Sequence, residues 1–210
     1  MIMEFYEAVN NRRTCRMWDD RDVNRDVIDR ILSAAVKAPS NDHLRQWQFV
    51  ILRTQEEKDN ALQFVKAFDE KIKNGSIGNP GKADLAQRMY AHALPRQYSM
   101  LNDCPYVILP FFKAAPAFFN PVAINSYNSF ASIWCVIENI FLAASAEGLA
   151  TSMRIPVGDE SALTASAVNA PDGWIFPCYI GIGYPSDDEP EIEQVPCKIE
   201  DIIHEGKWQL

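Results

Sequence analysis

The sequence predicts a single α+β domain. Three short apolar segments with strand character, 47–52, 106–112 and 177–185, are separated by long stretches in which apolar residues recur at helical spacing. At 210 residues the chain has the length of one domain, and such a chain buries about 70 % of the surface of its unfolded form. No internal repeat and no linker-like segment divides the sequence, so we expect one domain over residues 1–210.

A helix and a strand form the first part of the domain. Between Val23 and Ala38 apolar residues recur at helical spacing, Asn24 is placed to cap the start, and Pro39 ends the pattern. Segment 47–52 is rich in aromatic and β-branched residues and predicts a strand. Residues 39–46 therefore form the loop between the helix and the strand.

The middle of the chain predicts two helices and a second strand. Residues 56–73 and about 82–101 have helical patterns, and segment 74–81 between them contains three glycines and a proline, which favours an irregular loop. Segment 106–112 then predicts a buried strand. Residues 74–105 are thus an excursion from the domain, either a lid over a pocket or a plain surface feature.

A strongly apolar helix precedes the last strand. Its apolar residues recur from Phe130 to Ala144, and Gly148 is placed as a left-handed C-terminal cap. The composition is close to that of a membrane span, but Glu138 and Asn139 at its centre would be costly in lipid, so we expect a core helix. Segment 177–185 predicts the last core strand, and an acidic run and a tail follow it.

Composition and charge exclude several classes of protein. Hydrophobic residues make up 48 % and charged residues 23 %, values typical of a soluble globular domain. The net charge of -8 argues against a nucleic-acid partner, and the N-terminus lacks the features of a secretory signal. The five cysteines are widely spaced without a C-x-x-C pair, which favours a reducing compartment, and we expect a cytoplasmic protein without a membrane partner.

Motifs for nucleophilic, metal-assisted and nucleotide-loop chemistry are missing from the sequence. Only three histidines occur, none at metal-ligand spacing, and there is no G-x-S-x-G elbow. Cys135 and Cys178 fall inside apolar elements, which indicates core positions. Gly181-Ile182-Gly183 is followed by no third glycine and no helix start, so it is not a dinucleotide fingerprint.

One compact basic cluster stands out in this acidic chain. Arg12, Arg13 and Arg16 lie within five residues, with Thr14 between them. Arginine presents a planar fork of donors that grips phosphate oxygens and stays charged at any working pH, so the cluster suits a phosphate ester. The alternative is a solvated basic turn paired with the aspartates at 19, 20 and 22.

Five segments together resemble the FMN-dependent nitroreductase family. Residues 12–16 resemble its R-R-S-x-R element, and 38–41 with Trp47 and 49–50 resemble its A-P-S-x-x-N-x-Q-P-W-x-F-V segment. Residues 143–152 resemble the A-A-x-x-x-G-L-G-T helix end, 180–185 the I-x-L-G-Y-P strand, and 199–208 the family's tail. Each motif is short, but their order and spacing agree over nearly the whole chain.

The resemblance implies a fold, a cofactor and an assembly. It implies an α+β fold, a three-layer α-β-α sandwich with a central, mainly antiparallel sheet, and a homodimer with FMN at the subunit interface and the C-terminal tail extended onto the partner. Arg12, Arg13, Thr14 and Arg16 would hold the phosphate and ribityl chain. Further cofactor-binding positions follow by the same matching: Pro39, Ser40, Asn41 and His43 from the partner subunit, and Met153, Arg154, Ile155 and Pro156 near the flavin ring.

This sequence departs from the family pattern at several positions. The family's usual Asn, Gln and Pro fall on His43, Arg45 and Gln46. Pro156 has no N–H with which to contact a flavin, so the register of 153–156 is open. Arg154, the only Lys or Arg in residues 114–197, either touches the flavin or an anionic substrate or lies on the surface.

The tail offers two lysines in place of the basic residue that normally helps bind the phosphate. These are Lys198 and Lys207, and we favour Lys207.

The implied function is oxidoreduction with no essential protein acid or base. NADH or NADPH would deliver hydride to FMN, and a small conjugated acceptor such as a nitroaromatic or a quinone would then take the electrons in a ping-pong cycle. No catalytic side chain and no metal are expected. Two alternatives remain: a specialised flavin reductase such as a reductive dehalogenase or enone reductase, and a non-catalytic flavin-binding protein whose flavin face is blocked by Phe118, Phe119 or Tyr127.

Overall fold

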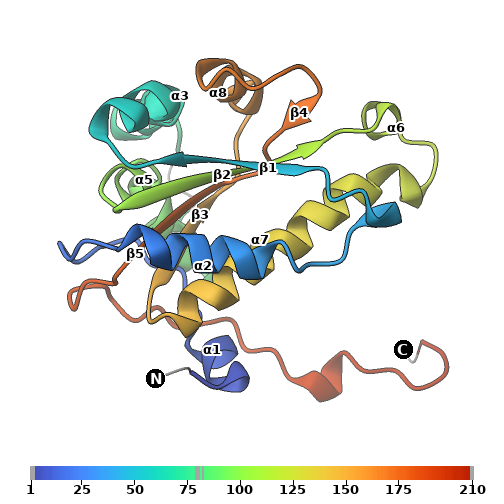
Figure 1. Ribbon diagram of the computed structural model, residues 1–210. Helices are drawn as coiled ribbons and strands as arrows, with labels where there is room; N and C mark the ends of the chain where they lie inside the picture. Colours follow the sequence, from blue (N-terminus) through green and yellow to red (C-terminus); the bar gives the residue numbers. More distant parts are fainter. Residues whose placement is uncertain (1–2, 79–80, 82, 209–210) are drawn as a thin grey trace.

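A five-stranded antiparallel sheet lies between two layers of helices (Figure 1). The computed structural model describes residues 3–78, 81 and 83–208. The strands are β1 (Trp47–Leu52), β2 (Tyr106–Lys113), β3 (Ala150–Arg154), β4 (Trp174–Ile175) and β5 (Tyr179–Gly183). Their order is β1-β2-β5-β3, and β4 pairs with the end of β2. The predicted three-layer α-β-α sandwich with a mainly antiparallel sheet is confirmed.

The central strand β2 supplies both cores of the sandwich. Because side chains alternate across a strand, Tyr106, Ile108 and Phe112 enter one core cluster and Val107, Leu109 and Phe111 the other. All of these side chains are buried. The continuous apolar run of β2 therefore reflects burial on both faces, which an alternating apolar and polar pattern would not allow.

Three helices lie on one side of the sheet (Figure 1). They are α1 (Phe5–Asn11), α2 (Arg25–Ala35) and α7 (Asn128–Ala146), and α7 packs against both of the others as well as against β2 and β3. Helix α1 packs on the far side of α7 from the strands (Figure 1). The side chain of Asn24 accepts a hydrogen bond from the Asp26 N–H at 2.9 Å, which confirms the predicted cap. Gly148 has a φ of +75°, which confirms the predicted left-handed end of α7.

The apolar character of α7 is explained by packing. The stretch Ile124–Ala146 is long and apolar enough to cross a membrane by length and composition. In the structure Ile133, Val136, Ile137 and Ile140 of this helix are buried in the core. Cys178 is buried as expected, but Cys135 is exposed, so its predicted core position is wrong: it lies on the face of α7 turned away from the sheet.

Helices α3 (Gln55–Lys73), α5 (Ser99–Asn102) and α8 (Glu160–Ala167) cover the other face. A capping box at Thr54 and Glu57 starts α3. The buried Lys58 of α3 donates to the carbonyls of Asn102 and Cys104, which ties this helix to the start of β2. The exposed fraction of Lys58 is 6 %, so these carbonyls take the place of water as hydrogen-bond partners of its amino group.

The excursion is helical but broken. In place of the single helix predicted over about 82–101, the structure has α4 (Leu85–Ala93), a 3-10 turn η2 (Leu94–Arg96) and α5. Pro95 sits in this turn. Proline removes a helical hydrogen bond and clashes with the preceding turn, so the helix is interrupted here. The apolar pattern continues across the interruption, which is why the sequence predicted a single helix.

Several elements carry too little sequence signal to be predicted. These are α1, β3, β4 and α8, the short helix α6 (Pro116–Phe119), and the 3-10 turns η1 (Asn41–His43), η3 (Ile124–Tyr127) and η4 (Ile199–Asp201). All of them are shorter than nine residues, so their periodicity is not distinguishable from chance.

The C-terminal segment leaves the body of the domain after β5. From about residue 190 to residue 208 it runs past α1 and out beneath α7 (Figure 1). It exposes Val195, Ile199, Ile202, Ile203 and Trp208. An extended arm with this much exposed apolar surface is typical of a segment that packs on a partner.

Candidate functional site

The arginine segment lies along the free edge of β3. Thr14 forms a parallel bridge with Thr151, and the Cys15 N–H donates to the Thr151 carbonyl at 2.9 Å. Two segments separated by more than 130 positions, 12–16 and 150–154, are thereby placed side by side. The first segment and the last two residues of the second, Met153 and Arg154, were predicted to bind one cofactor.

A pocket of about 650 Å³ opens at this edge. Arg12, Arg13, Thr14 and Arg16 line it, together with the backbone turn after α7 at Gly148. Another part of the lining comes from the start of the C-terminal segment and includes Glu189, Glu191 and Glu193, and Met89 of α4 contributes from the excursion. The volume lies in the range of small-molecule and cofactor sites.

The three arginines have different surroundings. Arg13 is exposed, and its Nη1 donates to the carbonyls of Asn10 at 2.6 Å and Arg12 at 2.8 Å. Arg12 ends α1 and is half-buried. Arg16 is half-buried, its backbone N–H donates to Glu189 Oε2 at 3.0 Å, and its buried Nε has no hydrogen-bond partner in the described part of the chain. The cluster is therefore not a solvated turn but one wall of a pocket.

Arg16 belongs to a group of charges drawn from three segments. Burial lowers the pKa of Arg16, Glu189 opposes this effect, and Arg96 reinforces it. Burial, then Arg96 and Arg16, lower the pKa of His92 on α4. An anion beside Arg16 would relieve the repulsion among these groups, since an opposite charge favours their protonated forms.

Cys15 is not a nucleophile candidate in spite of its place at the pocket. Burial raises the pKa of its thiol to about 11. The thiol donates to the Met17 carbonyl at 2.9 Å. A neutral, hydrogen-bonded thiol is unreactive at neutral pH.

The loop that follows α2 lies elsewhere. The Asn41 N–H donates to Ser132 Oγ at 2.9 Å, and Asn41 Oδ1 accepts from Asn128 at 3.0 Å, so the loop is fixed to the N-terminal end of α7. Asp42, His43 and Arg45 all have φ near +50°. Such backbone strain in residues other than glycine is concentrated at functional loops.

The two halves of the predicted site do not meet within one chain. Ser132 contacts the Asn41 loop and Ser145 lines the arginine pocket, and these serines are 13 positions apart on α7, about 20 Å at the rise of an α-helix. Pro39 and His43 are exposed at the loop end, far from the arginines. Lys207 is exposed in the tail and does not line the arginine pocket.

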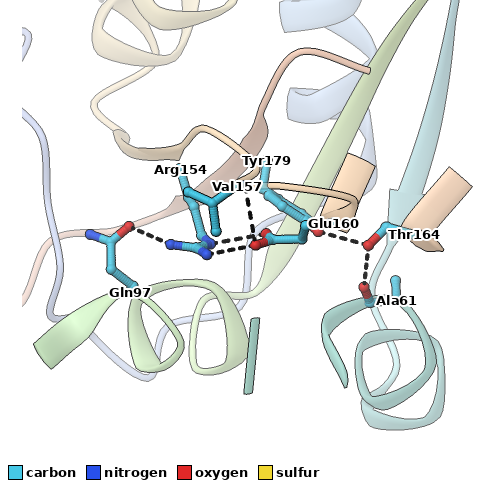
Figure 2. Close-up of polar contacts among 7 residues, drawn as sticks. All are labelled: Ala61, Gln97, Arg154, Val157, Glu160, Thr164 and Tyr179. Atoms are coloured by element: carbon cyan, nitrogen blue, oxygen red, sulfur yellow. Dashed lines mark hydrogen bonds and ion pairs between the residues drawn. The ribbon is translucent and has the colours of Figure 1, made fainter. Parts of the chain in front are cut away.

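Arg154 is neither a surface residue nor free to touch a ligand, which corrects the expectation for its side chain. It is 4 % exposed and forms a bidentate ion pair with the buried Glu160, Nη2 to Oε2 at 2.7 Å and Nε to Oε1 at 3.1 Å (Figure 2). Met153, its neighbour on the strand, packs on the opposite face of the sheet. Ile155 after it is exposed and Pro156 half-buried.

Sequence reasoning missed the partners of two arginines. Glu160 and Gln97 contact Arg154, and Glu189 faces Arg16. The isolation of Arg154 in a stretch without other basic residues was a usable signal, because a lone cation in an apolar region needs a buried carboxylate. Glu189 gave no such signal, since an acidic run after the last strand is typical of a solvated tail.

Together the fold and the pocket define the class: an α+β sandwich with an arginine-lined pocket at the edge of its sheet. The chain belongs to the nitroreductase family, whose pattern matches residues 9–184. The resemblance to this family inferred from the sequence is thereby confirmed.

Among characterised proteins the chain is similar to iodotyrosine deiodinases. It is 28 % identical to iodotyrosine deiodinase 1 of Sus scrofa over 199 residues, which are 92 % of this chain and 66 % of the relative. It is 30 % identical to the iodotyrosine deiodinase of Haliscomenobacter hydrossis over 111 residues, 53 % of this chain and 48 % of that one. The chain thus spans just under two thirds of the first relative's length and about half of the second's.

Solved structures share the fold. Iodotyrosine deiodinase bound to FMN and 3-iodo-L-tyrosine superimposes with a TM-score of 0.74 at 18 % identity, over 98 % of this chain and 100 % of that one. A variant of the FMN- and NADPH-dependent nitroreductase NfnB from Sphigopyxis sp. strain HMH superimposes with a TM-score of 0.72 at 18 % identity, with the same coverage.

Proposed function

We propose that the protein is an FMN-dependent oxidoreductase whose cofactor site is shared between two subunits. The single observation that carries the proposal is the pocket of about 650 Å³ whose wall is formed by Arg12, Arg13 and Arg16 beside the edge of β3. The family of the chain and the FMN-bound relatives support the same cofactor.

The residues of the pocket fit a phosphate ester. Three guanidinium groups and the Thr14 hydroxyl provide a dense set of donors for a dianion. The buried, unpartnered Nε of Arg16 indicates that this guanidinium lacks part of its hydrogen-bonding in the free chain. Arg12, Arg13, Thr14 and Arg16 would therefore hold the phosphate end of FMN.

The separation of the two halves supports a dimeric site. Within one chain the Asn41 loop and the arginine pocket lie about 20 Å apart along α7. In a homodimer the loop of one subunit, with Pro39, Ser40, Asn41 and His43, would reach the arginines of the other. The C-terminal arm would bury its exposed apolar residues by packing on the partner subunit, and this packing would carry Lys207 onto the partner.

FMN, when bound, would accept hydride from NADH or NADPH and pass the electrons to a small conjugated acceptor such as a nitroaromatic or a quinone. The chain's own groups would bind and orient. Segment 153–156 would face the ring, the arginines would hold the phosphate, and the excursion would border the pocket through Met89. No side chain at the pocket is needed as an acid or base, and a cytoplasmic location agrees with five unpaired thiols.

The cofactor is tested by its colour and its affinity. The purified protein should be yellow, or become so with added FMN, and NADH or NADPH should bleach it in the absence of oxygen. The double variant Arg12→Ala, Arg13→Ala should keep the fold and lose FMN affinity by about tenfold or more, because charge-assisted bonds to the phosphate are removed. A protein that cannot take up FMN, or an unchanged affinity in the variant, would refute the proposal; Arg25→Ala is the control at an exposed arginine outside the pocket.

The shared site has its own test. A subunit with Ser40→Ala and Asn41→Ala and a subunit with Arg12→Ala and Arg13→Ala should each bind FMN poorly alone. Mixing and reassociating them should restore one intact site in each mixed dimer, about a quarter of all sites. No recovery in proven mixed dimers would contradict a site built from two subunits.

Reductive dehalogenation is a second candidate reaction. It is favoured by the similarity to iodotyrosine deiodinases over 92 % of this chain. Reduced protein incubated with 3-iodo-L-tyrosine should then release iodide, and nitroaromatic reduction with no iodide release would decide for the first candidate.

A further inference from the structure

A buried ion pair lies beneath the loop that follows β3, at the end of the strand opposite to Ala150, which lines the pocket. Arg154 is the last residue of β3 and Glu160 the first residue of α8, and their side chains are 3 % and 4 % exposed. The pair makes two hydrogen bonds, at 2.7 and 3.1 Å. Figure 2 shows the guanidinium and the carboxylate facing each other across the base of the loop.

The loop itself is exposed while its ends are fixed. Ile155 is 54 % and Val157 46 % exposed. The Val157 N–H points back to Glu160 Oε2 at 3.4 Å, so the same carboxylate contacts the middle of the loop as well as its start. The Glu160 carboxylate therefore adds a side-chain anchor to a loop that is also held by the backbone bond from the Glu160 N–H to the Val157 carbonyl at 3.1 Å.

The same guanidinium reaches two further elements. Arg154 Nη1 donates to Gln97 Oε1 at 3.1 Å, and its Cζ lies 4.7 Å from the ring centroid of Phe68 on α3. Gln97 directly follows η2 in the excursion. Strand β3, helix α8, helix α3 and the excursion thus meet at one buried cation.

Such a pair is a poor source of stability. Burying two charges costs about as much as their attraction returns, and apolar residues of similar volume often serve stability as well or better. What an ion pair with two fixed bonds adds is a defined geometry, since its hydrogen bonds are directional and apolar contacts are not. A positioning role therefore explains the pair better than a stabilising one.

We propose that the Arg154–Glu160 pair is a positioning device that holds residues 155–159 in the conformation in which they face the flavin, and that Gln97 ties this loop to the excursion. The proposal rests on the proposed function, which places segment 153–156 at the ring. The pair does not touch the cofactor, so its influence is exerted through the backbone of the loop.

The test uses the FMN-loaded protein and a double variant, Arg154→Met with Glu160→Leu, which removes both charges at similar volume. We expect it to fold and to bind FMN within about threefold of the original affinity, because the phosphate arginines are intact. The visible absorption spectrum of the bound flavin and its midpoint potential should shift, and kcat for NAD(P)H oxidation should fall about tenfold with KM little changed. Gln97→Leu, which removes one bond only, should shift the same spectrum in the same direction by less.

Thr164→Val is the matched control. Thr164 is fully buried next to the pair, and its hydroxyl bonds Tyr179 at 2.7 Å and the Ala61 carbonyl at 3.3 Å without contacting the loop (Figure 2). It should lower stability and leave the flavin spectrum and potential unchanged. An unaltered spectrum and potential in the double variant, or equal shifts in the control, would overturn the positioning role, whereas an original protein that binds no FMN would overturn the proposed function itself.

Discussion

Removal of one member of the buried ion pair should be far more damaging than removal of both. In Arg154→Met the carboxylate of Glu160, 5 % exposed, loses both of its charge-assisted bonds to the guanidinium, and the weak contact from the Val157 N–H carries no compensating charge. An uncompensated buried charge of this kind costs about 3 to 5 kcal/mol. A domain of this size has a free energy of unfolding of roughly 5 to 15 kcal/mol, so this single change removes a large part of it.

The expected loss in free energy of unfolding is large enough to measure by thermal or urea unfolding. A loss of about 4 kcal/mol corresponds to a fall in Tm of roughly 8 to 16 °C for a domain of this length. Urea unfolding of the cofactor-free protein, followed by circular dichroism, should show it as a lower midpoint at unchanged slope. Adding Glu160→Leu to Arg154→Met should recover more than half of the loss, because no buried charge then remains.

The control is the exposed pair of Arg25 and Asp29 on α2, which has one short bond of 2.8 Å. Arg25→Met should change the free energy of unfolding by no more than about 0.5 kcal/mol. The reasoning fails if Arg154→Met alone unfolds within about 1 kcal/mol of the original protein, or if the double variant is as unstable as the single one.

Three further predictions concern the pocket, the sheet and a helix start. Glu189→Gln keeps an acceptor for the Arg16 N–H but removes a carboxylate from the arginine pocket, so FMN should bind about three- to tenfold tighter in a fluorescence titration, and unchanged or weaker binding would contradict a phosphate at this wall. Gly181→Ala would bring a Cβ to 2.4 Å from Ser152 Oγ and 3.0 Å from the Met100 carbonyl, and should cost about 1 to 3 kcal/mol by urea unfolding, whereas Gly78→Ala meets nothing within 4 Å and should cost little. Thr54→Ala removes the capping box of α3 and should cost about 1 kcal/mol in the same assay, with a loss under 0.3 kcal/mol counting against the cap.

Elements with long or strongly apolar patterns could be read from the sequence. The helix after Asn24, the strand at 47–52 and the helix ending at Gly148 all form as expected, because local propensity, capping and apolar periodicity agree at each of them. The strand β3 was not expected. Its five residues include Thr, Ser and Arg, and they become a strand only because β5 pairs with them on one side and Thr14 bridges them on the other.

Among the candidate site residues, too, some could be singled out from the sequence and others required the structure. The arginine cluster was singled out from its residue types, since phosphate recognition needs several adjacent donors and such runs are visible in a sequence, and the loop at Asn41 was singled out from its resemblance to the family. The role of Arg154 was not, because the sequence contains a lone arginine but not its surroundings. Only the structure shows that the guanidinium points away from the pocket and into the helical layer of α3 and α8.

The sequence by itself determined the α+β class, the principal strands and the chemical character of the arginine cluster, since all three depend on residue types and on short spacings. The tertiary structure alone decided which segments face one another: that Thr14 lies on β3, that Glu189 shares the pocket of Arg16, and that the Asn41 loop lies at the opposite end of α7. These relations depend on the pairing of strands and the packing of helices between residues far apart in the chain, and no local pattern encodes them.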